Sequence, residues 1–258
     1  METPIHLEKQ GHVAILTLHN PPAHTWTETS LRLLRDIVLE LNHDASNASL
    51  VITGQGEKFF SAGADLKLFA GGQIEIASRM TRAFGEAFET LAAYRGVSIA
   101  AINGYAMGGG LECALACDLR LADQHALMAL PETKVGLLPC GGGTQTLPWL
   151  VGEAWAKRMI LCGEQVNAET ALRIGLVEEV LEKGQALQRA LALAEQVGKQ
   201  SPGSIKAAKA LIMSARTRPM LSAWSAEREA FVALFGTEDQ KEGVNAFLEK
   251  RAPVWKNY

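Results

Sequence analysis

The sequence predicts an α/β fold with parallel strands, followed by a region made of helices alone. Two observations lead to this prediction. Over residues 13–123, short apolar runs alternate with segments whose apolar residues recur at helical spacing, which is typical of strand–helix units in a parallel sheet. From residue 186 onward only helical patterns are found. We therefore expect a core domain over residues 1–195 and a helical region over residues 196–258.

The first unit of the predicted core is a strand, a helix and a second strand. VAILTL (13–18) is an apolar run that ends at the turn-forming residues NPP, and LVIT (50–53) is another that ends at GQG. Five apolar residues between them recur at helical spacing: Leu31, Leu34, Ile37, Val38 and Leu41. Three hydroxyl residues are candidate caps of this helix: Thr27, Thr29 and Ser30.

The pattern then continues through the middle of the chain. A helix with a polar face is expected around residues 74–92, followed by a buried strand at SIAAIN (98–103). GGGLECALACDL starts a further helix, and LRLAD (119–123) returns as a strand. After a last strand-like run, LVEEVL (176–181), the helical region is broken at three places: SPG (201–203), Pro219 and FGTED (235–239).

Composition and charge favour a protein that acts on small molecules. The chain has 258 residues, 48% of them hydrophobic, which is enough to bury a large core and to form a pocket. A net charge of −3 without blocks of like charge argues against nucleic acid or an anionic membrane as a partner. The N-terminus METPIHLEKQ lacks the features of a signal peptide, and no apolar run is long enough to span a bilayer. A cytoplasmic location is expected.

Several common catalytic motifs are absent. The glycine clusters complete neither the dinucleotide-binding pattern nor a P-loop, and no G-x-S-x-G sequence occurs. The six histidines show no metal-ligand spacing, and the four cysteines form no CxxC pair. We expect a reducing compartment, no metal site and no cofactor.

GEKFFSAGADLKLF (56–69) is the first of three stretches that contain candidate chemistry. Its simplest interpretation is an ordinary turn, which Gly63 permits and after which Asp65 caps a helix. The functional interpretation is that small residues let a ligand approach the N–H of Ala64, with Lys67 one turn further on for an anionic group. Taken alone, this stretch favours the ordinary turn.

GYAMGGGLE (104–112) is the second stretch. Each glycine weakens a helix by roughly 1 kcal/mol relative to alanine, so helix propensity does not explain three in succession. A strand that runs through a glycine turn into a helix presents free N–H groups at the positive end of the helix dipole, which suits an anion or a developing oxyanion. Glu112 is either a simple partner of this dipole or a catalytic carboxylate, and the stretch by itself favours neither.

The third stretch, ALPETKVGLLPCGGGTQTLPWLVG (129–152), contains Glu132 and a second glycine cluster. An isolated glutamate in a loop is usually solvated and inert. Two glutamates in apolar, glycine-rich surroundings, together with two candidate backbone donors, instead indicate an acid/base pair beside an oxyanion hole.

Four segments together resemble the crotonase superfamily, and within it the enoyl-CoA hydratases: SAGADLK, AAINGYAMGGGLECALACDLRLA, LPETKVGLLPCGGGTQTLPWLVG and EGVNAFLEKRAPVW. The resemblance covers nearly the whole chain. It implies a crotonase-like spiral of ββα units with a C-terminal helical trimerisation region, assembled as a trimer or a dimer of trimers. It also implies an acyl-CoA thioester as the substrate.

By motif position, the resemblance assigns the catalytic carboxylates to Glu112 and Glu132 and the oxyanion hole to the N–H groups of Ala64 and Gly109. It implies syn addition of water to a 2-enoyl-CoA, with Glu112 activating water and Glu132 protonating C2, although two coupled carboxylates leave the opposite assignment open. It implies a set of substrate and CoA contacts: Ala62, Ala64, Asp65, Leu66, Lys67, Gly108, Gly109 and Lys250. The acyl pocket is expected to be lined in part by Trp26, Phe69, Phe84, Met107 and Leu138.

Two stretches depart from the family pattern. The loop NPPAHTWT lacks the charged residue and the asparagine that many relatives carry, and Cys140 stands where a small residue is usual. Neither belongs to the acid/base pair, but both leave the acyl pocket open to an unusual substrate. The alternatives are a 3-enoyl-CoA isomerase or carnitinyl-CoA dehydratase on the same fold, and an RNA-binding or scaffolding relative. The absence of a basic helix argues against the last class.

Overall fold

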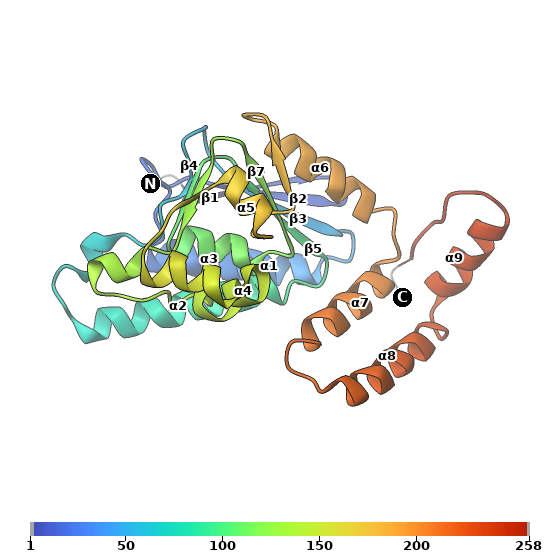
Figure 1. Cartoon of the computed structure of the whole chain (residues 1–258). Helices are drawn as coiled ribbons and strands as arrows, with labels where there is room; N and C mark the ends of the chain where they lie inside the picture. The colour runs from blue at the N-terminus through green and yellow to red at the C-terminus, as the bar shows by residue number, and fades with distance from the viewer. Residues whose placement is uncertain (1–2, 257–258) are drawn as a thin grey trace. The chain divides into compact units, whose positions relative to one another are not determined.

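The computed structural model describes residues 3–256 and divides the chain into two compact units. The first unit, residues 1–194, contains two sheets and the helices that cover them. In the described part of the second unit, residues 195–258, every regular element is a helix (Figure 1).

The larger sheet forms the centre of the first unit. Its strands lie in the order β1 (Ile5–Gln10), β2 (Val13–Leu18), β3 (Ser49–Gly54), β5 (Val97–Ile102), β7 (Leu119–Asp123) and β10 (Glu179–Leu181). β1 pairs with β2 in antiparallel orientation, and every other neighbouring pair is parallel. All six residues of β3 are buried, because helices cover both faces of a parallel sheet.

The two faces of this sheet pack against different helices. Along β2, Val13 and Ile15 belong to an apolar cluster with the alanines of α6 (Ala186–Val197), whereas Leu16 and Leu18 point into the main core on the opposite face. That main core is closed by the helices α1 (Glu28–His43), α2 (Ile74–Ala92), α3 (Gly109–Ala116), α4 (Gly143–Leu161) and α5 (Ala168–Arg173). Figure 1 shows α1 to α4 below the sheet and α6 above it.

Helix α1 illustrates how the sequence defines these elements. Thr27 and Ser30 form a reciprocal capping box at its start, in which each side chain accepts a hydrogen bond from the backbone N–H of the other residue. The helix then buries the expected apolar side at Leu31, Leu34 and Leu41, which are fully inaccessible to solvent.

A smaller sheet brings together the motifs that the sequence singles out. Its strands lie in the order β4 (Phe59–Ser61), β6 (Tyr105–Met107), β8 (Leu127–Ala129) and β9 (Val166–Asn167). The first three strands are mutually parallel, and β9 is antiparallel to β8. Since parallel neighbours end at the same edge, the three segments that follow β4, β6 and β8 leave the sheet side by side. These segments contain the three candidate motifs.

The second unit contains α7 (Pro202–Ser214), α8 (Met220–Leu234) and α9 (Glu238–Leu248). Ser201 and Thr237 cap α7 and α9, and Pro219 precedes α8. Large apolar side chains are exposed on these helices in the single chain, among them Ile212, Leu221, Trp224, Phe231, Phe247 and Leu248.

In the part of the chain that the structure describes, no helix is both long enough and apolar enough to cross a membrane.

Candidate active site

The three motifs meet around one cavity of about 600 Å³. The segment after β4 contributes Ala62, Gly63 and Ala64 to its wall, and the segment after β6 contributes Gly108, Gly109 and Glu112. The segment after β8 contributes Glu132, which begins the short helix η2 (Glu132–Val135). The small sheet therefore brings residues from three distant parts of the sequence to one site.

Two backbone N–H groups are available at this cavity. Within residues 3–256, the structure pairs neither the N–H of Ala64 nor that of Gly109 with an acceptor. Gly109 is the first residue of α3, so its N–H has no acceptor within the helix and lies at the positive end of the helix dipole. The N–H of the preceding Gly108, by contrast, donates to Ala129 O at 2.9 Å. Two free donors on one cavity wall are what an oxyanion hole requires.

Close contact between the segments that follow β4 and β6 depends on Gly63. Its φ is +87°, and a Cβ at this position would lie 2.6 Å from Met107 O and 3.2 Å from Gly109 N. No side chain fits there, since both the backbone conformation and the available space exclude one. Gly63 is therefore needed both for the turn and for the close contact between the two backbone segments.

Glu112 is buried and held by a second glycine cluster. Its carboxylate is carried by the first turn of α3 and is only 2% exposed. Its Oε1 accepts hydrogen bonds from Gly141 N and Gly143 N, each at 2.8 Å. A Cβ at Gly143 would lie 3.0 Å from this oxygen, which explains why glycine is needed here. Burial raises the pKa of Glu112, and the backbone donors oppose this by stabilising the ionised form.

Glu132 lies on the same cavity in a different environment. Its Oε1 comes within 3.0 Å of the position that a Cβ of Gly108 would occupy. Its Oε2 is buried and has no hydrogen-bond partner among the described residues. Burial raises the pKa of Glu132 from 4.5 to about 7, and the charge of Glu112 contributes in the same direction. One carboxyl group is therefore anchored by donors, while the other holds a proton near neutral pH.

The other predicted contacts divide into those that line the cavity and those that do not. Seven further predicted residues lie on its wall: Ala62, Leu66, Phe69, Phe84, Met107, Gly108 and Leu138. Asp65 instead caps the short helix η1 (Leu66–Phe69) through an N–H···O bond from Lys67 N to Oδ1 at 3.1 Å, and the wall includes neither Asp65 nor Lys67. Lys250 follows α9 in the second unit with φ +55°, and its contact with CoA stays a prediction.

Trp26 requires a correction. The sequence places it in the acyl pocket, but it does not line the cavity, and only 1% of it is exposed. Its ring points into the core, where it packs edge-on against Phe88 with the ring centroids 5.7 Å apart. Its indole N–H donates to Gly109 O at 3.2 Å. The side chain therefore lies behind the cavity wall.

Part of the cavity wall was not predicted from the sequence. Ala77 and Thr81 reach the cavity from α2, and Lys134, Val135 and Leu137 reach it from the segment around η2. The apolar run VGLL after PETK could have indicated Val135 and Leu137, which are 54% and 43% exposed in the single chain. Nothing in the periodicity of α2 separates Thr81 from its solvent-facing neighbours.

Cys140 lies on the cavity wall as a protonated thiol. Desolvation of the sulfur, with the charges of Glu112 and Glu132, raises the pKa of Cys140 to about 12, although the residue as a whole is exposed. A thiol with so high a pKa is a poor nucleophile, so its position does not indicate covalent catalysis.

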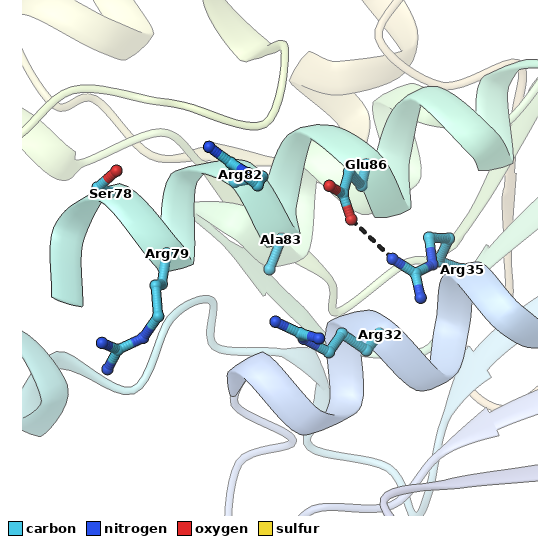
Figure 2. Close-up of a pocket in the computed structure, with 7 residues that line it drawn as sticks. All are labelled: Arg32, Arg35, Ser78, Arg79, Arg82, Ala83 and Glu86. Carbon is cyan, nitrogen blue, oxygen red and sulfur yellow. Dashed lines mark hydrogen bonds and ion pairs between the residues drawn. The ribbon is translucent and has the colours of Figure 1, made fainter. Parts of the chain in front are cut away.

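A second hollow lies between α1 and α2 and has a different character. It is lined by arginines from both helices, Arg32, Arg35, Arg79 and Arg82 (Figure 2). Arg35 pairs with Glu86 at 2.7 Å, and Glu28 lies between Arg32 and Arg79 at 2.6 and 3.5 Å. The Arg35–Glu86 and Arg79–Glu28 pairs connect the two helices, and such exposed pairs contribute little to stability.

Comparison with known proteins shows the family to which the chain belongs. The model of the family described as enoyl-CoA hydratase/isomerase matches residues 8–258. The chain belongs to the enoyl-CoA hydratase/isomerase family. The family match confirms the resemblance that the motifs suggest, and it identifies the chain as an enzyme of this type.

Solved structures and a curated relative extend the comparison. The structure of DspI from Pseudomonas aeruginosa is 60% identical, with a TM-score of 0.97 over 99% of this chain and 97% of that chain. An enoyl-CoA hydratase from Bacillus anthracis is 34% identical, with a TM-score of 0.95 over 99% of this chain and 100% of that chain. The carnitinyl-CoA dehydratase of Salmonella typhi is 36% identical over 260 residues, 99% of each chain. These likenesses confirm the crotonase-like fold, while relatives at similar identity carry different reaction names.

The raised pKa of Glu132 predicts that Glu132→Gln stabilises the folded protein more at pH 8 than at pH 5. Between pH 4.5 and about 7 the folded protein binds the proton more tightly than the unfolded chain, so stability falls as the pH rises through this window. Glutamine has no proton to lose. Urea denaturation of both proteins at the two pH values measures the difference in unfolding free energy.

Glu153→Gln is the control, because this exposed side chain on α4 is 77% accessible and pairs with Lys157. This substitution removes a carboxylate charge that is exposed rather than buried. It should therefore not increase the free energy of unfolding at pH 8. An equal increase in the free energy of unfolding for Glu132→Gln at both pH values would contradict the raised pKa.

Proposed function

We propose that the protein is an enoyl-CoA hydratase that adds water in a syn manner across the 2,3 double bond of a 2-enoyl-CoA, giving a 3-hydroxyacyl-CoA. The observation that carries this proposal is the presence of Glu112 and Glu132 on one cavity with two unpaired backbone N–H groups. An acid/base pair beside an oxyanion site suits proton transfer next to a thioester carbonyl.

In this proposal the N–H groups of Ala64 and Gly109 bind the thioester oxygen. Their hydrogen bonds polarise the carbonyl and make C3 electrophilic, and they stabilise the enolate that forms when water adds. The dipole of α3 acts in the same direction, since Gly109 lies at its N-terminus. Ala62, Leu66 and Gly108 line the same wall, and we expect them to contact the substrate.

The two carboxyl groups supply complementary proton transfers. The Gly141 and Gly143 N–H groups favour the ionised form of Glu112, and its Oε2 accepts the proton of the water that attacks C3. Glu132 keeps a proton near neutral pH and delivers it to C2. The two groups titrate as a coupled pair, so these roles belong to the pair in its singly protonated state.

A second candidate is the dehydration of a hydroxyacyl-CoA such as carnitinyl-CoA, favoured by the relative of that name. The same two carboxyl groups would run the reaction in reverse. A 3-enoyl-CoA isomerase needs only one carboxylate, so the presence of two favours hydration or dehydration over isomerisation.

The decisive experiment measures the loss of enoyl-thioester absorbance with trans-2-enoyl-CoAs of four to sixteen carbons. We expect turnover of at least one chain length, with a 3-hydroxyacyl-CoA identified by chromatography. The ratios of kcat/KM across the panel then define the acyl specificity. Absence of turnover with every chain length, or a shifted alkene as the sole product, would refute the proposal.

We further propose that the C-terminal unit assembles the chain into a trimer or a dimer of trimers. The exposed apolar residues of α7, α8 and α9 support this, since large apolar surfaces are typical of interfaces. In this assembly we expect Lys250 to approach the CoA phosphates of a neighbouring subunit, and Asp65 and Lys67 to contact CoA in their own subunit. Multi-angle light scattering tests the assembly, and a monomer at micromolar concentration would exclude it.

A further inference from the structure

Trp26 hydrogen-bonds to the segment that carries Ala64. Its backbone N–H donates to Gly63 O at 2.8 Å, and its carbonyl accepts from Asp65 N at 3.1 Å. The two bonds form an isolated parallel bridge between Trp26 and Ala64. Because both neighbours of Ala64 are bound in this way, the direction of the Ala64 N–H is fixed from behind.

The side chain of the same residue reaches the second donor segment. Its indole N–H donates to Gly109 O, 83 positions away in sequence, and a Cβ at Gly109 would lie 3.4 Å from the Cδ1 atom of the ring. The ring is fully buried and packs edge-on against Phe88. A buried indole needs an acceptor for its single donor, and here that acceptor belongs to Gly109, which lines the cavity.

The loop that carries Trp26 is itself bound to the first donor segment. Ala62 N donates to Ala23 O at 2.9 Å, and the Ser61 hydroxyl donates to His24 O at 2.7 Å. The His24 ring contacts Asn20 N and Gln55 O through its two nitrogens. The loop is therefore a rigid support rather than a flexible connection.

From these contacts we propose that Trp26 is a positioning residue that fixes the separation and direction of the Ala64 and Gly109 N–H groups. This inference rests on the proposed function of these groups as the oxyanion hole. Trp26 touches neither the cavity nor the substrate that would occupy it, so it acts through the two backbone segments. It also gives a structural role to the tryptophan of the loop NPPAHTWT, which departs from the family pattern.

We expect the loss of the Trp26 indole bond to change the rate of the reaction more than the stability of the fold. Displacement of a catalytic group by 1 Å can lower a rate by about 100-fold, and loss of the indole bond alone loosens the Gly109 segment without removing it. We therefore expect Trp26→Phe to lower kcat by about tenfold and to change KM little, because the carbonyl contact strengthens as charge develops on the oxygen.

Two measurements test this inference, and the first does not depend on activity. Amide hydrogen exchange of the substrate-free enzyme should become about tenfold faster in peptides covering residues 105–112 of Trp26→Phe, and change less in residues 60–66, which the backbone of residue 26 still binds. The second measurement compares kcat and KM with the best enoyl-CoA of the panel. If the wild type proves inactive, the proposed function fails, and the exchange data still decide whether Trp26 holds the two segments.

Tyr94→Phe is the matched control. Tyr94 is a fully buried aromatic residue of the same unit whose hydroxyl bonds with Asn47 at 2.5 Å, and it does not line the cavity. It should lower stability without changing exchange in the two segments or kcat. Unchanged exchange in residues 105–112 of Trp26→Phe, or equal changes in the control, would overturn the proposal. A change in KM with kcat unaffected would also overturn the proposal.

Discussion

Replacement of Glu112 or Glu132 by glutamine is expected to lower kcat for hydration by about 10³-fold, within the range that general acid–base groups contribute. Glutamine retains the shape of the side chain and an oxygen that can accept from Gly141 N and Gly143 N. It removes the group that accepts or donates the proton. The fold should therefore persist while the chemical step fails.

The double variant should be only slightly slower than either single variant, because residues that act as one unit are not additive. Stopped-flow absorbance gives kcat for the slow variants, and circular dichroism confirms that they are folded. Glu153→Gln, with the same charge change on the exposed face of α4, should keep the wild-type rate. Full activity in both single variants would exclude the acid/base roles.

The long elements of the core were predictable from the sequence because their patterns repeat several times. The predicted runs at 13–18 and 119–123 coincide with β2 and β7, and the predicted helix at 74–92 coincides with α2. β1 (Ile5–Gln10) was missed, since five of its six residues are exposed and it pairs with β2 at the edge of the sheet.

The short strands of the second sheet could not be predicted. β4, β6 and β8 have three residues each, too few to show a period of two. Their pairing, however, is what brings Ala64, Gly109 and Glu132 to one cavity. The motifs gave the candidate residues, while their convergence depends on non-local pairing that no local pattern encodes.

The hydrogen bonds within the site also depend on non-local contacts that sequence motifs do not show. A sequence motif identifies Glu112 but does not show that the glycine cluster at 141–143 supplies its donors. The aromatic character of Trp26 suggested an apolar lining, whereas its indole N–H bonds to Gly109 O in the core. Hydrogen bonds across 29 to 83 positions follow from the three-dimensional fold and were not predictable from spacing.

Gly63→Ala should also have a large effect, lowering kcat by about 10² to 10³-fold, the loss expected when one oxyanion donor is displaced. The new Cβ would lie 2.6 Å from Met107 O, which is backbone and cannot rotate away, and 3.2 Å from Gly109 N. The segments carrying the two N–H groups must then separate. Steady-state kinetics with an enoyl-CoA measure the loss, and thermal denaturation measures the accompanying destabilisation.

Gly11→Ala separates this effect from backbone strain. Gly11, between β1 and β2, also has a positive φ of 58°, but a Cβ there would meet no atom within 4 Å. Both substitutions place alanine in the left-handed region at a cost of about 1–2 kcal/mol, and only the one at Gly63 moves the two donor segments apart. Gly11→Ala should therefore lower the melting temperature and leave kcat near the wild-type value. Equal kcat in the two variants would mean that contact between the donor segments is not what the reaction requires.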